Sequence, residues 1–535
     1  MASRNRTLVA AWAGVGATAL SLLTIGCGSG TDVAAGGQGP GTGGAGACAE
    51  CSGEQLWSKS FGDDDPVGAS GERGMDLGID SQGNIAVAGA FSGTIDFGDG
   101  TGLVSEDDTL GQIFVASLGP DGSARWARTT LPTQIPSEGQ TLLSVSPDPS
   151  GNVVLAGEFG GGLDLGGGEL LSNVQPVVDP GCCREVAGFV AKLDPTGEHL
   201  WSKRIGNASP VCSTYCTEAF PYVVTVAHAA VDGDGDVLIW GSFQGEIDLG
   251  GGPLVGAQPL TADASDLFAA KLDAQGNHVW SKYLGQGPDG LVYGAVDATS
   301  DLWLFGGFTG TIDLGAGPLV SAGGSDIFLA RLDRDGNTLW SKRFGGPGDQ
   351  GSWGWNIIAP TPSAEVVLLA WSTEPVDFGG GPIGATEDRC DLLVKLDSSG
   401  EHVWSRHLDT PSVDSWSLKV GPEAEVVLGG TFSGSIDLGA GPLTAAGERE
   451  LFLVKLTAEG APVWGQHFGS ALQASDKPAP STGCDGYLCN TVDALGLDAN
   501  GNAVLTGKFR GTLDLGAGPL VSQGVADGYV AKFAR

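Results

Sequence analysis

The feature that most constrains this chain is a tryptophan motif that returns seven times. One copy reads "TLWSKRFG" (338–345), and the next copy along the chain, "HVWSRHL" (402–408), follows the same pattern. A period of this kind indicates a repeat architecture, in which each unit packs against its neighbours. The seven tryptophans are Trp57, Trp126, Trp201, Trp280, Trp340, Trp404 and Trp464.

Two further motifs recur with the same count. One of them, "FTGTIDLG" (308–315), has an aspartate followed two residues later by glycine. The other, "DIFLARLD" (326–333), alternates between apolar and other residues, as a strand does. The recurring aspartates are Asp96, Asp164, Asp248, Asp313, Asp377, Asp437 and Asp514.

The fourth unit shows what one repeat contains. Its short β-rich runs are 291–297, 302–308, 326–333 and 338–345, and turn residues such as "RDGN" separate them. Short runs joined by Gly, Asp and Asn predict antiparallel strands with tight turns. Four strands repeated seven times predict an all-β fold, a seven-bladed β-propeller with four antiparallel strands per blade.

The chain begins and ends in the middle of a repeat. The last unit supplies three strands within 492–533, and the missing fourth strand is present at 55–62. An unpaired blade edge would expose backbone donors and acceptors. We therefore predict that the N-terminal strand completes the closing blade and that residues 54–535 form one propeller.

The recurring tryptophan and aspartate have structural explanations. Tryptophan is large and apolar with one N–H, and a copy in every blade favours packing over a ligand platform. An aspartate beside glycine is typical of a turn, where its carboxylate accepts backbone N–H bonds.

The repeats resemble a known bacterial family. "GNVVLAGEFGGGLDLG" (151–166) and "FVAKLDPTGEHLWSKRIG" (189–206) are similar to the SBBP repeat of seven-bladed β-propellers, over about residues 55–535. The resemblance implies the fold and an extracytoplasmic setting, but no shared catalytic residues. The fifth unit departs from the pattern, with Ala370, Ser372 and Glu374 and the turn "APTPSAE", so its shape is hardest to predict.

The N-terminus predicts export. Arg4 and Arg6 precede an apolar stretch that ends at "LTIGC", which is typical of a secretory signal and resembles a lipobox. We expect residues 1–26 to be a lipoprotein signal peptide, with Cys27 lipidated. Residues 27–53 would be a flexible Gly-rich tether to a membrane. An ordinary signal peptide cut further on, or an uncleaved anchor, is the alternative.

The net charge of the chain indicates which kinds of partner are unsuited to it. The formal net charge is −36, and no basic patch stands out that would suit nucleic acid. No nucleic-acid partner is therefore expected, and the protein is predicted to be a monomer.

Cysteine use agrees with an oxidising compartment. Disulfide bonds are expected within the pairs Cys48/Cys51 and Cys484/Cys489, and between Cys182 and Cys183 on one side and Cys212 and Cys216 on the other. A zinc site, or a bond between the adjacent Cys182 and Cys183, is the alternative for the group of four. Cys390 is left over.

Catalytic motifs are absent from the sequence. It has no G-x-S-x-G elbow, H-E-x-x-H or P-loop. Asp232, Asp234 and Asp236 in "DGDGD" are a candidate calcium site, but the twelfth position of a calcium loop is Phe243, which favours an Asp-rich turn. No catalytic residue, no metal and no cofactor are predicted.

Loop lengths predict a working face. The first-to-second and third-to-fourth strand turns are short and uniform, whereas long insertions occupy the other connections: 171–188, 206–222 and 470–489. Long loops on a rigid scaffold often bind partners. We expect a non-catalytic binding or scaffold role, with protein or glycan bound by this loop face. The alternative is a propeller enzyme of quinoprotein type, because "AKLDPTGEHLW" (191–201) is similar to the tryptophan-docking motif of those enzymes.

Overall fold

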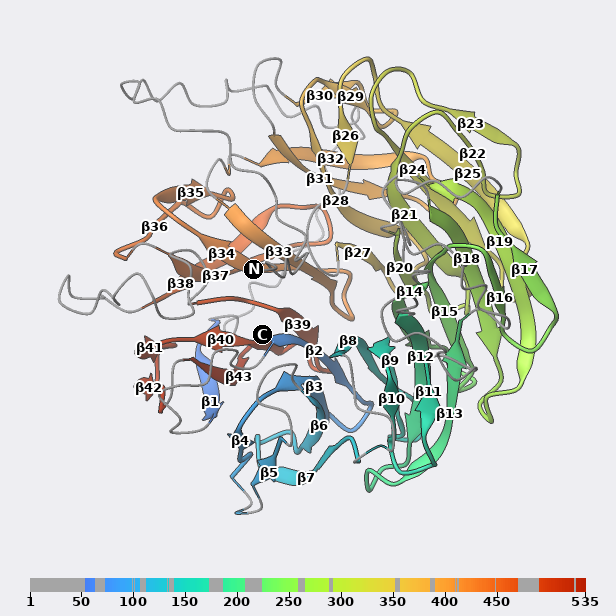
Figure 1. The fold of residues 1–535 in the computed structure, drawn as a ribbon. Coiled ribbons are helices and arrows are strands. Elements are labelled where there is room, and N and C mark those ends of the chain that lie inside the picture. The colour runs from blue at the N-terminus through green and yellow to red at the C-terminus, as the bar shows by residue number, and fades with distance from the viewer. Residues whose placement is uncertain are drawn as a thin grey trace, which may run out of the picture.

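A computed structural model confirms the predicted all-β propeller (Figure 1). Seven antiparallel sheets surround a central axis, and the described residues contain no helix. None of the described segments is a helix long and apolar enough to cross a membrane. The structure describes residues 53–62, 73–98, 100, 102–105, 112–131, 133, 139–172, 186–206, 224–257, 265–287, 292–351, 357–384, 390–408, 410, 413–447, 449–469, 490–523 and 526–535.

Each blade is numbered here by the order of its innermost strand, strand a. These strands are β2 (Arg73–Ile79), β8 (Gly139–Pro147), β14 (Val224–Val231), β20 (Val292–Val296), β27 (Ile358–Pro360), β33 (Val413–Val420) and β39 (Ala494–Leu497). The second strands, strands b, are β3 (Ile85–Phe91), β9 (Val153–Gly160), β15 (Val237–Phe243), β21 (Leu302–Phe308), β28 (Val366–Ser372), β34 (Val426–Phe432) and β40 (Ala503–Phe509).

The outer half of each blade holds strands c and d. Strands c are β6 (Gln112–Leu118), β12 (Val186–Leu193), β18 (Ser265–Leu272), β24 (Asp326–Leu332), β31 (Cys390–Leu396), β37 (Glu450–Leu456) and β43 (Asp527–Phe533). Strands d are β7 (Ala124–Thr129), β13 (His199–Ile205), β19 (His278–Gly287), β25 (Thr338–Phe344), β32 (His402–Leu408), β38 (Pro462–Phe468) and, in blade 7, β1 (Gln55–Phe61).

The core lies between neighbouring blades. Strands b and c read as continuous apolar runs, as in β3, whose seven residues are all buried. Both faces of such a strand are covered, because each sheet packs against a blade on either side. One cluster joins Ala88 and Val115 of blade 1 to Leu155 and Phe189 of blade 2. The fold is therefore stabilised blade against blade, as expected for a repeat protein.

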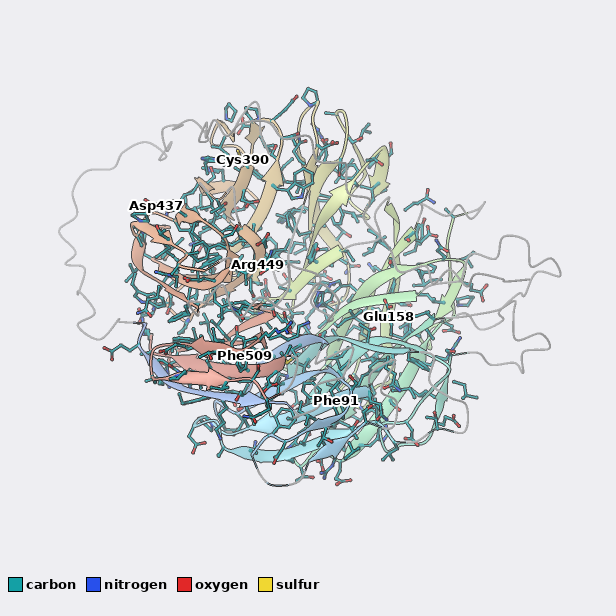
Figure 2. The ribbon with its side chains drawn as sticks, turned by 60° about the vertical axis from the view of Figure 1, so that its left-hand side comes forward. Phe91, Glu158, Cys390, Asp437, Arg449 and Phe509 are labelled. Carbon is teal, nitrogen blue, oxygen red and sulfur yellow. The ribbon has the colours of Figure 1, made fainter. Side chains whose placement is uncertain are left out.

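Every blade also carries a small hairpin between strands b and c, which the repeat pattern did not predict as a separate element. In each hairpin the recurring aspartate accepts the N–H of the glycine two residues later; the bond from Gly439 to Asp437 is 2.7 Å. Asp437 lies at the outer rim of blade 6 (Figure 2). The hairpins are β4 (Thr94–Ile95) with β5 (Leu103–Val104), β10 (Gly162–Leu163) with β11 (Leu170–Leu171), β16 (Glu246–Asp248) with β17 (Pro253–Val255), β22 (Thr311–Asp313) with β23 (Pro318–Val320), β29 (Val376–Asp377) with β30 (Pro382–Ile383), β35 (Ser435–Asp437) with β36 (Pro442–Thr444), and β41 (Thr512–Asp514) with β42 (Pro519–Val521).

The two ends of the described chain complete one blade, as predicted. Strand β1 pairs antiparallel with β43, with Phe61 opposite Gly528 (Figure 1). The backbone N–H of Ala534 donates to the carbonyl of Glu54 at 2.7 Å. An intact c–d turn has the same bond, from Asp194 to Glu198 at 2.8 Å. The chain ends therefore reproduce a turn that is continuous in the other six blades.

Blade 5 keeps the fold although its sequence departs from the repeat. Its first strand is split into β26 (Gln350–Gly351) and β27, and both pair with β28. The a–b turn still closes, because Thr361 N–H donates to the Glu365 carbonyl at 2.8 Å. Ala364 has a φ of 58° there, the conformation that glycine has in most of the other a–b turns.

Candidate functional site

The strands a form a closed ring around the propeller axis, and each contacts the next one round. Their positions can be compared because each a–b turn closes with one backbone bond, as from Asp80 to Asn84. Two residues before the turn, six blades have a small residue and blade 6 has Lys419. The small residues are Gly78, Ser146, Ala230, Ala295, Ala359 and Gly496.

Lys419 interacts electrostatically with groups on two other blades, Asp76 of blade 1 and His228 of blade 3. Burial lowers the pKa of Lys419, and the charge of Asp76 acts in the opposite direction. Lys419 in turn contributes to the lowered pKa of His228. Asp76 lies on β2 and His228 on β14, and β14 is across the ring from β33 (Figure 1). Leu418, the residue before it, is buried in the core between blades, and side chains alternate along a strand, so Lys419 points the other way, towards the axis.

The Lys419 ammonium has no hydrogen bond and no ion pair with any part of the chain that the structure describes. Part of the Lys419 surface is exposed to solvent. The residues at the equivalent position on the neighbouring strands a are small. An amine in this position is available to a ligand rather than committed to the fold.

His228 is held neutral beside the axis. Burial, with a smaller contribution from Lys419, lowers the pKa of His228 to about 4. Its ring lies 5.8 Å from that of Trp240, whose indole N–H is buried with no partner in the described structure. At neutral pH this imidazole can accept a proton.

The pKa of the Asp493 carboxyl group is shifted upwards, whereas that of His228 is shifted downwards. Burial raises the pKa of Asp493, against the charge of Lys508 and hydrogen bonds from Thr491 and the Met75 backbone. One of its carboxyl oxygens is buried without a hydrogen-bond partner among the described residues. The groups that act on Asp493 come from its own blade, Thr491 and Lys508, and from the Met75 backbone of blade 1, so this carboxyl group lies where blades 7 and 1 meet.

The repeated tryptophans make the same contact in successive blades. In six blades the indole N–H donates to a carbonyl in the c–d turn of the next blade, as from Trp126 to Pro195 at 2.9 Å. Each indole also lies against the glycine of that turn; a Cβ on Gly197 would be 2.7 Å from Trp126. Trp464 faces the split turn and stacks on Gly53, but its N–H has no partner in the described part.

The three aspartates proposed as a calcium site are paired with basic side chains. Asp232 and Asp236 accept from Lys271 Nζ at 2.8 and 3.1 Å, and Asp234 pairs with Arg334 at 2.8 Å. The lysine occupies the centre of the turn that a cation would need. The described residues contain no group of three or more His, Cys, Asp or Glu placed to hold a metal.

Most of the cysteine predictions fall outside the described residues. These are the lipidation of Cys27 and the disulfide candidates Cys48, Cys51, Cys182, Cys183, Cys212, Cys216, Cys484 and Cys489. The signal peptide, nearly all of the tether and most of each long loop insertion also lie outside. Cys390 is buried on β31, at the position labelled in Figure 2.

None of the residues Asp76, His228, Lys419 and Asp493 belongs to a repeated motif. Alignment of the seven units at their a–b turns would single out Lys419, because small residues occupy its position elsewhere. A comparison of the repeats does not single out His228 or Asp493. Their pKa shifts arise from burial, and only the assembled ring buries them.

No protein-family model and no curated protein matches the chain. What remains of the resemblance to the SBBP repeat family is therefore the seven-bladed propeller fold itself.

Several solved structures match. The chain is 11% identical to a puromycin hydrolase, covering 83% of this chain and 59% of that one, with a TM-score of 0.34. An α-L-arabinanase of Penicillium chrysogenum is 11% identical over 73% of this chain and 92% of that one, with a TM-score of 0.34. A sialidase of Streptococcus pneumoniae is 12% identical over 90% of this chain and 70% of that one, with a TM-score of 0.33. Likenesses at this level concern the fold alone.

The prediction of a non-catalytic binding or scaffold role through the loop face is wrong. Solved propellers that match the chain include hydrolases, so a fold of this kind gives no reason to exclude catalysis. The sequence prediction excluded it because no linear catalytic motif is present. In a propeller, however, reactive side chains can come from separate blades, and such a set leaves no linear motif.

Proposed function

We propose that this protein is an exported propeller enzyme whose reactive site lies at the axis and acts on a small anionic substrate. The observation that carries the proposal is the position of Lys419 on β33, where the other six blades have a small residue and where its ammonium makes no hydrogen bond or ion pair with the described residues. An unpaired ammonium at a site lined by small residues is suited to bind an anionic group.

Two further buried side chains have pKa shifts that suit acid–base chemistry. Groups whose surroundings move their pKa values in opposite directions are the usual acid and base of an enzyme. Here the pKa of Asp493 is raised, which favours a proton donor, and that of His228 is lowered to about 4, which favours a proton acceptor. A hydrolysis needs both, one for the leaving group and one for the attacking water.

The N-terminal segment supports the proposed location outside the cytoplasm, and it has no bearing on the proposed chemistry. The signal-like N-terminus, the resemblance to lipoprotein signals at Cys27 and the Gly-rich segment favour a propeller that stands outside the cytoplasm, tethered to a membrane. Both described chain ends belong to the c–d turn of blade 7, so the tether would leave from the face of short, uniform turns.

A substrate panel tests the proposal. Purified protein would be assayed with 4-nitrophenyl esters, phosphates and glycosides, including uronides. We expect turnover of anionic members, and a loss of at least about a hundredfold in kcat/KM for Lys419→Met, the scale of one acid–base or binding group. The rate should rise as the pH increases through about 4, because His228 must be neutral.

Lys203→Met is the matched control, since Lys203 lies on the outer strand β13, away from the axis. It should leave the rate unchanged. A Lys419→Met protein that keeps the wild-type rate, or turnover confined to uncharged substrates, would contradict the proposal.

A further inference from the structure

A cavity of about 210 Å³ lies where blades 7 and 1 meet, on the face of the short, uniform turns. Strands β1 and β43, the a–b turns of both blades and the c–d turn of blade 1 form its walls. In Figure 1 it lies on the side of the ring where the chain ends close blade 7 against blade 1. Among the residues that line it are Leu56, Trp57, Gln82, Pro120 and Asn500.

Two other junctions of the ring have an ion pair at the equivalent point. Between blades 3 and 4, Arg334, the second residue of a c–d turn, pairs with Asp234, the third residue of the preceding a–b turn, at 2.8 Å. Between blades 6 and 7, Arg535 pairs with Glu423 at the same two turn positions. In both places an arginine side chain bridges the gap between the two turns.

Pro120 and Asn500 occupy these two turn positions where blade 7 meets blade 1. A proline and an amide cannot form the ion pair, so the space that the arginine fills elsewhere is left open. The cavity therefore follows from the residues of this junction, and restoring the pair should close it.

The apolar wall of the cavity is held in a fixed orientation. Trp57 Nε1 donates to the Pro120 carbonyl at 3.1 Å, and a Cβ on Gly122 would be 2.9 Å from Trp57 Cε3. Leu56, the neighbour of Trp57 on β1, is 52% exposed. An aromatic ring that is already fixed offers apolar contact area with little loss of side-chain freedom on binding.

The polar side chains of the lining are either uncharged or already paired. Lys532 Nζ and Asp498 pair with each other at 2.8 Å, and each residue is 5% exposed. The Asn500 amide has no hydrogen bond with any residue that the structure describes. The Gln82 amide donates only to Ser81 Oγ, at 3.5 Å. The cavity therefore offers two available amides, each with donors and an acceptor, and no available charge.

We propose that this cavity binds one uncharged monosaccharide ring. A pyranose has an apolar C–H face that suits Trp57 and Leu56, and hydroxyl groups that both donate and accept, as the two amides do. The volume is below the roughly 300–1,000 Å³ of pockets for drug-sized ligands, which fits a single ring. An anionic sugar would find no unpaired cation in the lining, on a chain of net charge −36. This binding does not depend on the reaction proposed at the axis.

Isothermal titration calorimetry of the purified protein tests the proposal. The probes are methyl α-D-glucopyranoside, methyl β-D-galactopyranoside and methyl α-D-mannopyranoside, with sodium glucuronate as the charged counterpart. We expect at least one neutral glycoside to bind, and glucuronate to bind at least about tenfold more weakly. Asn500→Asp combined with Pro120→Arg should recreate the pair of Asp234 and Arg334, close the cavity and weaken binding at least about tenfold. Asn500→Ala should weaken it about fivefold, the effect of one neutral hydrogen bond.

Ser150→Asp combined with Ala274→Arg is the matched control, because it makes the same exchange at the junction of blades 2 and 3. It should leave binding unchanged, and so should Lys419→Met, which separates this site from the axial one. The proposal is overturned if none of the neutral glycosides binds, if glucuronate binds more tightly than they do, or if the Asn500→Asp, Pro120→Arg variant binds as the wild type does. Loss of binding in Lys419→Met would place the sugar at the axis and also overturn it. If the double variant does not fold, Asn500→Ala decides.

Discussion

At the scale of the residue, His228 shows how one position of a repeat acquires a chemical property. The equivalent residues of the neighbouring blades are Ser144, which bonds to the backbone of Ala229, and Tyr293. His228 instead packs against Trp240 and is 9% exposed. Because its pKa falls from 6.5 to about 4 on folding, the unfolded chain takes up a proton first as the pH drops. His228 therefore contributes no penalty above pH 6.5 and destabilises the fold progressively between pH 6.5 and 4.

The prediction at this scale concerns His228→Gln. A shift from 6.5 to about 4 corresponds to a free-energy penalty of about 3 kcal/mol once the pH is well below 4, and of about 2–3 kcal/mol at pH 4.5. Urea unfolding at pH 7.5 and 4.5 should show a difference in stability that is smaller by about 2 kcal/mol in the variant. His199→Gln, on the outer strand β13, should match the wild type. An unchanged difference in His228→Gln would show that this histidine is not buried neutral.

At the scale of the element, the closing strand β1 does the work of a covalently connected strand d. Trp57 on β1 donates to the Pro120 carbonyl at 3.1 Å, as its counterparts do in other blades. Gly53 replaces the turn glycine beneath Trp464 with a φ of 62°. Residues 53–61 therefore pair with the edge of β43 and also contact the two neighbouring blades through Trp57 and Gly53.

Removal of β1 should accordingly open the ring. A chain that begins at residue 62 loses a seven-residue strand and the packing of Trp57, and we expect its free energy of unfolding to fall by several kcal/mol. A chain that begins at Gly53 is the control and should melt as the full-length protein does. Equal melting temperatures for the two truncations would show that β1 does not hold blade 7 closed.

At the scale of the whole molecule, the ring has one break, and its geometry is that of a turn. The c–d turn of blade 2 runs from Asp194 to Glu198, and in blade 7 the equivalent residues are Ala534, Arg535, Gly53 and Glu54. Four residues stand in the place of five. The break therefore amounts to one missing residue rather than to a different structure.

A circular permutation follows from this equivalence. Arg535 joined to Gly53 through one residue, with new ends between Ser398 and Ser399, moves the break to the same place in blade 5. We expect a folded monomer with a Tm within a few degrees of that of a chain that begins at Gly53, measured by calorimetry and gel filtration. New ends within β31, between Leu393 and Val394, should prevent folding. Failure of the first permutant would mean that the position of the native break matters beyond its turn geometry.

The sequence by itself determined the architecture of this protein. The tryptophan, aspartate and strand motifs recur because each blade makes the same contacts with its neighbour, and local turns such as those of Asp313 need only nearby residues. The closing of blade 7 by residues 55–61 followed from where the repeat is cut. Even the departures of blade 5 left its sheet intact, because Thr361 and Ala364 can adopt the turn conformation.

Only the tertiary structure decided which side chains of different blades face one another across the ring. Lys419, His228 and Asp76 are far apart in the sequence and come from blades 6, 3 and 1, so no linear motif joins them. The lowered pKa values of Lys419 and His228 come mainly from burial, which does not exist before the ring closes. Likewise, Lys271 and Asp232 are far apart in the sequence, and their ion pair forms only when the strands of blade 3 assemble. Repeated residues report packing that is the same in every blade, whereas the axial site depends on residues that occur once.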